Sequence, residues 1–367
     1  MGPLEGVNVL EVGGIGPAPY ATMILADLGA SVIAIRRPGW AEQIWNIPPR
    51  FDLLNRGKQI VEADLTDSDQ RQAVQQLCNS ADILVEGFRP GVMERLGFGP
   101  NVCLRDNPRL VYCRITGWGQ SGPLSQAAGH DLNYIALSGA LGMMGAQGSP
   151  PPIPLNLIGD FAGGSLFAVS GILAALHRAA RTGAGQVIDS AMVDGVAHML
   201  AIYHGQVQAG MWREQRGVNI LDGGAPFYGV YETADGNHVT LAAAEPQFYR
   251  EFLERTELVA EDLPQQFDRS GWGRLRERFT ALFRTRTRSE WCALLEGTNV
   301  CFAPVLDLME STRDPHLSER EVFAEVDGVV QPRAAPRFSE TSCSEPNPLP
   351  LTHVTLDAAL ARWTVSS

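Results

Sequence analysis

Residues 7–36 read VNVLEVGGIGPAPYATMILADLGASVIAIR. The short apolar runs at 7–12 and 31–35 each predict a strand. Between them, a turn rich in glycine and proline leads into apolar residues at helical spacing over 20–28, and Gly29 marks the end of that helix. This β-α-β unit with short loops predicts the opening of a parallel sheet covered by helices.

Segments further along the chain extend this pattern to about residue 203. Strands are predicted at 83–85, 110–115 and 186–189, and helices around 69–78 and 192–203. Two segments rich in Gly, Ala and Leu, 131–145 and 160–181, suggest helices that pack closely against other backbone. The predicted fold class is therefore α/β, with a doubly wound and mostly parallel sheet.

The sequence changes character near Gly217. The tetrapeptide ADGN at 234–237 lies between two β-rich runs and predicts a hairpin, and charged amphipathic stretches follow it. A proline-rich run at 331–351 predicts an extended strap. We therefore expect a large α/β domain over residues 1–205, to which 330–367 return, and a smaller α+β domain over 217–320.

Composition excludes several classes of protein. A chain of 367 residues with 45% hydrophobic residues is not disordered, and its net charge of −12 argues against bulk binding to nucleic acid or anionic membranes. The longest uncharged apolar stretch, 161–176, is shorter than the roughly 20 residues of a membrane span and predicts a buried helix. No export or peroxisomal signal is recognisable, and the six cysteines lack zinc or redox spacing, so we expect reduced thiols in the cytoplasm.

The turn after the first strand is similar to a dinucleotide-binding loop but lacks its third glycine, because Pro19 stands there. The acidic residue expected about 20 positions later is also missing, since Arg36 and Arg37 end the second strand. These differences disfavour NAD. Arginines at this place can bind a phosphorylated ribose, so an NADP-dependent oxidoreductase stays an alternative.

Cationic residues gather in the first 90 positions. They are Arg36, Arg37, Arg50, Arg56, Lys58 and Arg89. Lys58 is the only lysine among 29 basic residues. The pattern fits a solvated surface, and it equally fits a phosphate-binding rim.

Four side chains are suited to acid–base chemistry. His130-Asp131 and Asp160 each precede a helix, where they either cap the helix or move a proton beside an N-terminus that stabilises an anion. Glu245 ends the second hairpin strand, either as an inward carboxylate or simply as a strand terminus before proline. No nucleophile elbow is present. The residues alone therefore favour an acid–base enzyme with a phosphorylated ligand.

Ordered motifs from Gly6 to about Val305 carry a resemblance to a known family. They include Gly16-Pro17-x-Pro19, Asn55-Arg56-Gly57-Lys58, Phe88-Arg89-Pro90-Gly91, Gly129-His130-Asp131-Leu132-Asn133-Tyr134, Pro154-Leu155-Asn156-Leu157, Asp160-Phe161-Ala162-Gly163-Gly164 and Glu245-Pro246-Gln247-Phe248-Tyr249. The chain resembles the family III coenzyme A transferases (CaiB/BaiF-like), and within them the α-methylacyl-CoA racemases. The segment from Gly39 to Phe51, with Trp40 and Trp45, matches no motif of that family.

The resemblance implies an isomerase that interconverts (R)- and (S)-2-methylacyl-CoA thioesters through an enolate, without a cofactor or metal. It assigns His130 and Asp160 to opposite faces of the α-carbon, Glu245 to holding His130, and Asp131 to the side of Asp160 or to the helix start. In transferases of the family, the residue that matches Asp160 is a nucleophile, so a family III CoA transferase is the alternative. His130 and Glu245 favour the racemase.

The resemblance also implies partners and a binding surface for CoA. Its CoA contacts map onto Arg37, Ala63, Asp64, Leu65, Thr66, Gly129, Leu132, Asn133 and Tyr134, to which charge adds Arg36, Lys58 and Arg89. It further implies an interlocked homodimer with a place in lipid metabolism, and no nucleic-acid or membrane partner.

Overall fold

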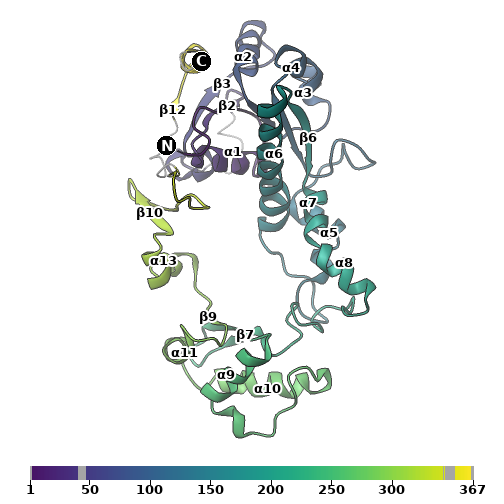
Figure 1. Cartoon of the computed structure of the whole chain (residues 1–367), viewed down its shortest axis with the longest axis vertical. Coiled ribbons are helices and arrows are strands. Elements are labelled where there is room, and N and C mark those ends of the chain that lie inside the picture. The colour runs from purple at the N-terminus through teal and green to yellow at the C-terminus, as the bar shows by residue number, and fades with distance from the viewer. Residues whose placement is uncertain (1, 40–46, 342, 344–351, 365–367) are drawn as a thin grey trace. The chain divides into compact units, whose positions relative to one another are not determined.

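The computed structural model describes residues 2–39, 47–341, 343 and 352–364. The chain folds into two compact units, and their elements are labelled in Figure 1. The large unit comprises Met1–Ser138, Pro154–Met199 and Asp314–Ser367, and the second unit comprises Gly139–Ile153 and Leu200–Arg313. The chain thus returns to the large unit at Asp314, earlier than the predicted residue 330, and 139–153 belong to the second unit. The proline-rich run that suggested the later boundary begins only after the returning hairpin of β10 (Phe323–Val326) and β11 (Val329–Pro332) has started.

A seven-stranded sheet forms the centre of the large unit, with the order β12-β3-β2-β1-β4-β5-β6 and all pairings parallel. The strands are β1 (Asn8–Val12), β2 (Ser31–Arg36), β3 (Lys58–Glu62), β4 (Ile83–Glu86), β5 (Val111–Thr116), β6 (Gln186–Ala191) and β12 (Thr352–His353). The predicted parallel α/β sheet is confirmed. Sequence patterns did not predict β3, because polar residues occupy both of its ends.

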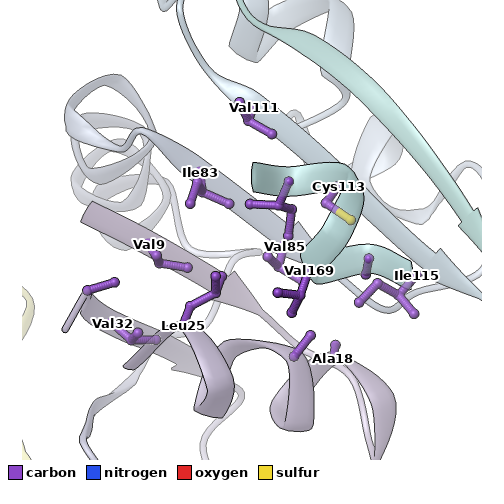
Figure 2. Packing of buried hydrophobic residues seen from close by; sticks show 14 of the residues in the cluster. Val9, Ala18, Leu25, Val32, Ile83, Val85, Val111, Cys113, Ile115 and Val169 are labelled. Atoms are coloured by element: carbon purple, nitrogen blue, oxygen red, sulfur yellow. The ribbon is translucent and has the colours of Figure 1, made fainter. Parts of the chain in front are cut away.

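Helices cover both faces of this sheet, as expected for a doubly wound fold. α1 (Pro17–Asp27) and α6 (Phe167–Thr182) pack on one face, where Val9 and Leu25 belong to a single core (Figure 2). α2 (Ser68–Ser80), α4 (Pro100–Asp106) and α14 (Leu356–Thr364) pack on the other face, around Leu10 and Leu77. Val9 and Leu10 enter different cores because successive side chains of a strand point to opposite faces.

A π-helical segment, η5 (Leu157–Leu166), leads directly into α6. It packs against α7 (Met192–Met199) so closely that a Cβ on Gly195 would lie 2.0 Å from the carbonyl oxygen of Gly163, which explains the small residues noted in the sequence. By length and hydropathy alone, Leu157–Thr182 is the one helical run among the described residues able to cross a membrane. In the large unit it has one buried face, which includes Ile172, and one exposed face, which includes Leu173, so the predicted buried helix is buried on one side only.

The second unit contains the predicted hairpin, β7 (Tyr228–Glu232) and β8 (His238–Ala242), joined by the antiparallel β9 (Phe302–Pro304). An aromatic core that includes Phe227, Phe252, Phe279 and Trp291 binds the sheet to its helices. The helices in this core are α9 (Pro246–Arg255), α10 (Trp272–Phe283) and α11 (Arg288–Leu295). The unit also contains α8 (Ala201–Gln208) and α12 (Leu308–Ser311).

Short elements complete the described residues. They are η2 (Pro49–Phe51), η3 (Leu53–Asn55), α3 (Val92–Leu96), α5 (Asp131–Leu137), η4 (Leu141–Met143), η6 (Leu258–Ala260), η7 (Arg269–Gly271) and α13 (Pro315–Glu319). Trp40, Trp45 and most of the run 342–351 lie outside the described residues.

Candidate active site

The carboxyl ends of β1 and β4 lie side by side at the position where the strand order reverses. Open parallel sheets bind ligands in the crevice at this position. The turn after β1 and the loop after β4 touch, since a Cβ added to Gly13 would lie within 2.1 Å of the Phe88 ring. The loop after β4 carries Arg89, which is exposed. The geometry of the sheet therefore places one predicted CoA-binding arginine at a ligand-binding edge.

His130 is the N-cap residue of α5 and is exposed. Its backbone N–H donates to Asn133 Oδ1 at 3.0 Å, which fixes the start of the helix. The next residue, Asp131, is buried. Its Oδ2 accepts the backbone N–H groups of Gly159 at 2.6 Å and of Asp160 at 2.7 Å. A single carboxylate thus ties the helix of His130 to the segment of Asp160, across 28 and 29 positions of sequence.

Asp160 lies in the π-helical segment η5 and is half-buried. Asn156 Nδ2 donates to its Oδ2 at 3.2 Å. Burial and the nearby charge of Asp131 raise the pKa of Asp160, while the hydrogen bond from Asn156 and the His130 side chain lower it less. His130 therefore lies within electrostatic reach of Asp160. A carboxyl group with a raised pKa is suited to accept and to return a proton.

Tyr134 packs between these groups and the strand ends. Its ring makes an edge-to-face contact with Trp118, with the ring centroids 4.8 Å apart, and a Cβ on Gly117 would lie 2.0 Å from the ring. Burial and the charge of Asp160 raise the pKa of Tyr134 to about 12, against the lowering effect of Arg89. Arg89, Tyr134 and Asp160 therefore share one electrostatic environment. Leu132 and Asn133 are exposed on the same first turn, and Gly129 is half-exposed just before it.

The loops after β2 and β3 bring together a second group of predicted CoA contacts. The backbone N–H of Ala63 donates to the carbonyl oxygen of Arg36 at 2.8 Å. Hydrogen bonds from Thr66 lower the pKa of Asp64, and Arg37 lowers it further, so Arg37 lies near this loop. Arg37, Asp64 and Thr66 are exposed, Leu65 is half-buried and Ala63 is buried. Arg37, Asp64 and Thr66 therefore share one surface, beneath which Ala63 is buried, and contact of this group with CoA stays a prediction.

Lys58 and Arg36 do not belong to that surface. The Lys58 side chain has no exposed area, and the Arg36 side chain is 2% exposed. Lys58 Nζ donates to Glu11, to the Pro19 carbonyl and to Asn55. This geometry argues against the predicted contact between Lys58 and a phosphate group, because its donors already have protein acceptors. The sequence pattern misled because a charged residue in a sequence is normally solvated.

Glu245 lies in the second unit, as the N-cap residue of α9. Its side chain is exposed, so it is not an inward carboxylate of that unit, and the interpretation as a strand terminus before proline describes its surroundings better. It lies near Cys301, whose pKa is raised by burial and further by the charge of Glu245.

Two contributors to the site were not singled out in the sequence. Asn156 belongs to the quoted motif Pro154–Leu157, but nothing in that motif shows that its amide reaches Asp160. Gly16 has a φ of +70°, and a Cβ there would lie 3.3 Å from Asp160 Oδ2. A glycine is therefore required at position 16 for two reasons, namely the positive φ of the backbone and the carboxylate that lies beside it.

The arrangement combines an exposed imidazole, a carboxyl group of raised pKa and the first turn of a helix, so it can move a proton and stabilise an anion. Among the residues that the structure describes, no group of three or more His, Cys, Asp or Glu side chains is placed to hold a metal ion.

Known proteins resemble this chain along nearly its whole length. The profile of CoA-transferase family III matches residues 4–353. The chain is 43% identical to an alpha-methylacyl-CoA racemase of Mus musculus and 42% identical to that of Homo sapiens, over 92% of this chain and 87% of each relative. It is 30% identical to a succinyl-CoA:glutarate CoA-transferase of Homo sapiens, over 95% of this chain and 83% of that relative. Among solved structures, a CAIB/BAIF family protein from Brucella suis superposes with a TM-score of 0.82 at 25% identity, over 100% of both chains.

Proposed function

This chain belongs to CoA-transferase family III, and on that basis we propose that it is a racemase that interconverts (R)- and (S)-2-methylacyl-CoA thioesters. The observation that carries the proposal is that Asp131 ties the backbone of Asp160 to the helix that starts at His130. The His130 side chain is close enough to influence the Asp160 carboxyl group, whose pKa is raised. Inversion without a cofactor needs two such groups, one for each face of the α-carbon.

In the proposed mechanism one base removes the α-proton and leaves its electron pair on the substrate. The C–H bond breaks, the pair moves toward the thioester carbonyl, and an enolate oxyanion forms. The conjugate acid of the other base then protonates the α-carbon from the opposite face. His130 and Asp160 take these two roles and exchange them when the reaction runs backward. The raised pKa of Asp160 supports this, because a carboxyl group near its usual pKa is a weak base toward carbon.

The enolate oxygen needs donors that are present before the reaction starts. In this proposal the donors are N–H groups at the start of α5, namely those of Asp131 and Leu132, since the N–H groups of Asn133 and Tyr134 already donate to the His130 carbonyl. One oxygen of the Asp131 side chain, Oδ2, accepts two backbone N–H groups and so fixes the segment of Asp160. We therefore assign Asp131 to positioning Asp160, and not to transferring the proton.

Further parts of the proposal rest on the family resemblance. These are a CoA-binding surface with Arg37, Arg89 and residues 63–66, a role for Glu245 in holding His130, an interlocked homodimer, activity without a cofactor, and a cytoplasmic location. Sedimentation of the purified protein tests the homodimer, and a sedimenting monomer at micromolar concentration contradicts it.

Isotope exchange tests the proposed reaction. Incubated in D₂O with single enantiomers of a panel of 2-methylacyl-CoA esters, from branched fatty acyl to arylpropionyl, the protein is expected to incorporate deuterium at the α-carbon as optical purity falls. A panel that keeps all of its α-protons contradicts the proposal. Transfer of CoA to a free carboxylic acid, with inactivation by hydroxylamine during turnover, identifies the transferase instead.

A further inference from the structure

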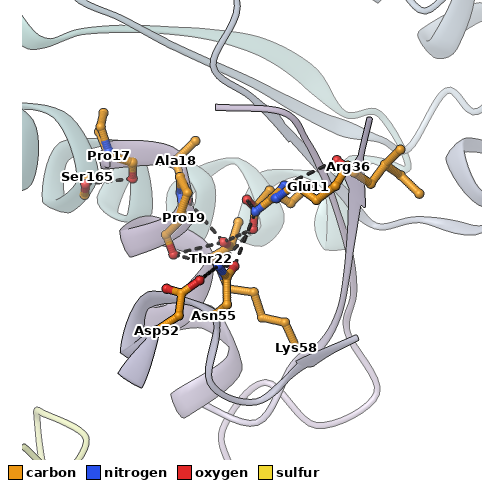
Figure 3. Close-up of polar contacts among 11 residues, drawn as sticks. Glu11, Pro17, Ala18, Pro19, Thr22, Arg36, Asp52, Asn55, Lys58 and Ser165 are labelled. Atoms are coloured by element: carbon orange, nitrogen blue, oxygen red, sulfur yellow. Dashed lines mark hydrogen bonds and ion pairs between the residues drawn. The ribbon is translucent and has the colours of Figure 1, made fainter. Parts of the chain in front are cut away.

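A cluster of buried charges lies beneath the turn that joins β1 to α1, and the proposed reaction does not use it. Glu11 has no exposed area. Its two carboxylate oxygens pair separately, one with Arg36 and the other with Lys58 Nζ at 2.9 Å (Figure 3). The Thr22 hydroxyl also donates to the oxygen that binds Lys58, at 2.6 Å.

Lys58 connects this cluster to the turn itself. Its Nζ donates to the backbone carbonyl of Pro19 at 2.8 Å, so a side chain from β3 holds the first turn of α1. Proline is common in the first turn of a helix and contributes no N–H there, but its carbonyl still accepts. The ammonium group thereby fixes the place where the chain leaves the turn.

The other side of the same turn faces Asp160. Gly16 lies against the Asp160 carboxylate, as the 3.3 Å separation of an added Cβ from Oδ2 shows. The Ser165 hydroxyl donates to the Pro17 carbonyl at 2.8 Å, and the Tyr20 ring packs on Phe161 with the centroids 4.5 Å apart. The turn is therefore held from two sides, by Lys58 at Pro19 and by Ser165 at Pro17 (Figure 3).

Retaining a buried lysine here carries a stability cost. Burial lowers the pKa of Lys58 to about 8, although the charge of Glu11 opposes this. Apolar residues that replace a buried ion pair often keep or raise the stability of a protein. An ammonium kept at this position is therefore better explained by what it orients, namely the Pro19 carbonyl, than by stability.

We propose that Lys58 is a positioning residue for Asp160, acting through the turn Gly16–Pro19 and without contact to substrate. The inference rests on the proposed function for the reaction in which Asp160 takes part, but the contacts that carry it do not depend on that reaction. If Lys58 bound a phosphate group of the substrate, its substitution would raise KM. A positioning role predicts a lower kcat instead.

Kinetics of two variants test this role. Lys58→Met keeps most of the volume but removes the donor to Pro19. Ser165→Ala frees the Pro17 carbonyl on the other side of the turn, and it also removes the hydrogen bond from the Ser165 hydroxyl to the Asp160 carbonyl. Because a displacement of about 1 Å costs up to about 100-fold in rate, we expect each to lower kcat by about 10-fold or more, with KM for the acyl-CoA within about twofold. Arg56→Met is the matched control. Arg56 is buried, so it does not belong to the phosphate-binding rim that the sequence allowed, and its guanidinium binds Asp27 at the other end of α1. We expect this variant to have lower stability with kcat unchanged.

Amide hydrogen exchange of the substrate-free protein gives a readout that is independent of turnover. Peptides that cover residues 13–25 are expected to exchange faster in Lys58→Met than in wild type, with the β4 peptides unchanged. Exchange unchanged at 13–25, or a raised KM with kcat intact, overturns the proposal. If wild type racemises no ester, the proposed function fails while the exchange result still decides whether Lys58 holds the turn. If Lys58→Met does not fold, the double variant Glu11→Gln/Lys58→Met replaces it, because it removes the carboxylate that Lys58 neutralises together with the lysine. Wild-type kcat in that double variant overturns the proposal.

Discussion

Two carboxylates flank the same turn and behave in opposite ways. Glu11 is completely buried, yet the charges of Arg36 and Lys58 and the Thr22 hydroxyl outweigh the effect of burial and lower its pKa to about 2. Asp160 is only half-buried, yet burial raises its pKa, because the hydrogen bond from Asn156 does not offset that effect and the charge of Asp131 adds to it. Burial raises the pKa of both carboxyl groups, and their partners decide whether that effect is outweighed, as in Glu11, or persists, as in Asp160.

The largest expected effect is on the reactive carboxylate. Asp160→Asn removes a base without changing shape, so we expect racemisation to fall by about 10²- to 10⁴-fold. The free energy of unfolding should stay the same or rise slightly, since the raised pKa means that the folded protein disfavours the ionised form. Asp69→Asn, at an exposed position of α2, is the matched control. A variant that is unfolded, or that racemises at the rate of wild type, contradicts the comparison.

The fixed charge should show the reverse pattern. Glu11→Gln leaves Arg36 and Lys58 without their carboxylate, and breaking a buried ion pair from one side costs about 3 to 5 kcal/mol. We expect a loss of that size in chemical unfolding, against less than about 0.5 kcal/mol for the exposed Glu62→Gln. Equal losses in the two variants would show that Glu11 is not a structural charge.

The contribution of Glu11 to the free energy of unfolding should depend on pH. Because the pKa of Glu11 is lowered from 4.5 to about 2 in the folded protein, its contribution is complete above about pH 4.5 and disappears as the pH falls toward 2. The gap in unfolding free energy between wild type and Glu11→Gln should therefore shrink by about 3 kcal/mol over that range. If the unfolding free energies of wild type and Glu11→Gln differ by the same amount from pH 5 to pH 2, the pKa of Glu11 is not lowered by folding.

A smaller effect is expected from the donor to Asp160. Asn156→Ala removes a hydrogen bond that lowers the pKa of Asp160, so the acidic limb of kcat/KM should move to higher pH. At neutral pH the rate should fall by about 2- to 10-fold, as the loss of one hydrogen bond allows. Asn156→Asp is not a suitable control, since it adds a charge. Asn79→Ala, at an exposed position of α2, is the control. If the acidic limb of the pH profile does not move in Asn156→Ala, Asn156 does not influence the Asp160 carboxyl group.

Much of the fold was predictable from residues 7–36, since alternation of apolar strands with a glycine-bounded helix is a local signal. The link from Asp131 to Asp160 was not, because a contact across 29 positions has no local signature. The sequence pattern placed Lys58 on a surface, although one residue, Glu11, indicated that a cation is buried nearby. Glu11 interrupts an apolar strand of a parallel sheet, and a buried carboxylate there requires cationic partners.

The roles of His130 and Asp160 came from the resemblance to family III and not from spacing. Residue types alone allowed helix caps as readily as bases. The structure shows the capping geometry, and the roles as bases stay a prediction. His130 is the N-cap residue of α5, and the Asp131 side chain serves the segment of Asp160. If the proposed reaction is correct, the residues that form the start of the helix also carry out the acid–base chemistry.

The most direct test of the two-base account is a crossed exchange experiment. His130→Ala and Asp160→Asn are each incubated in D₂O with the (R) and the (S) enantiomer of one 2-methylacyl-CoA. Neither variant should racemise, and each should exchange the α-proton of one enantiomer with retention of configuration, with the preferred enantiomer opposite in the two variants. If both variants exchange the same enantiomer, or either one still inverts the centre, His130 and Asp160 do not act on opposite faces.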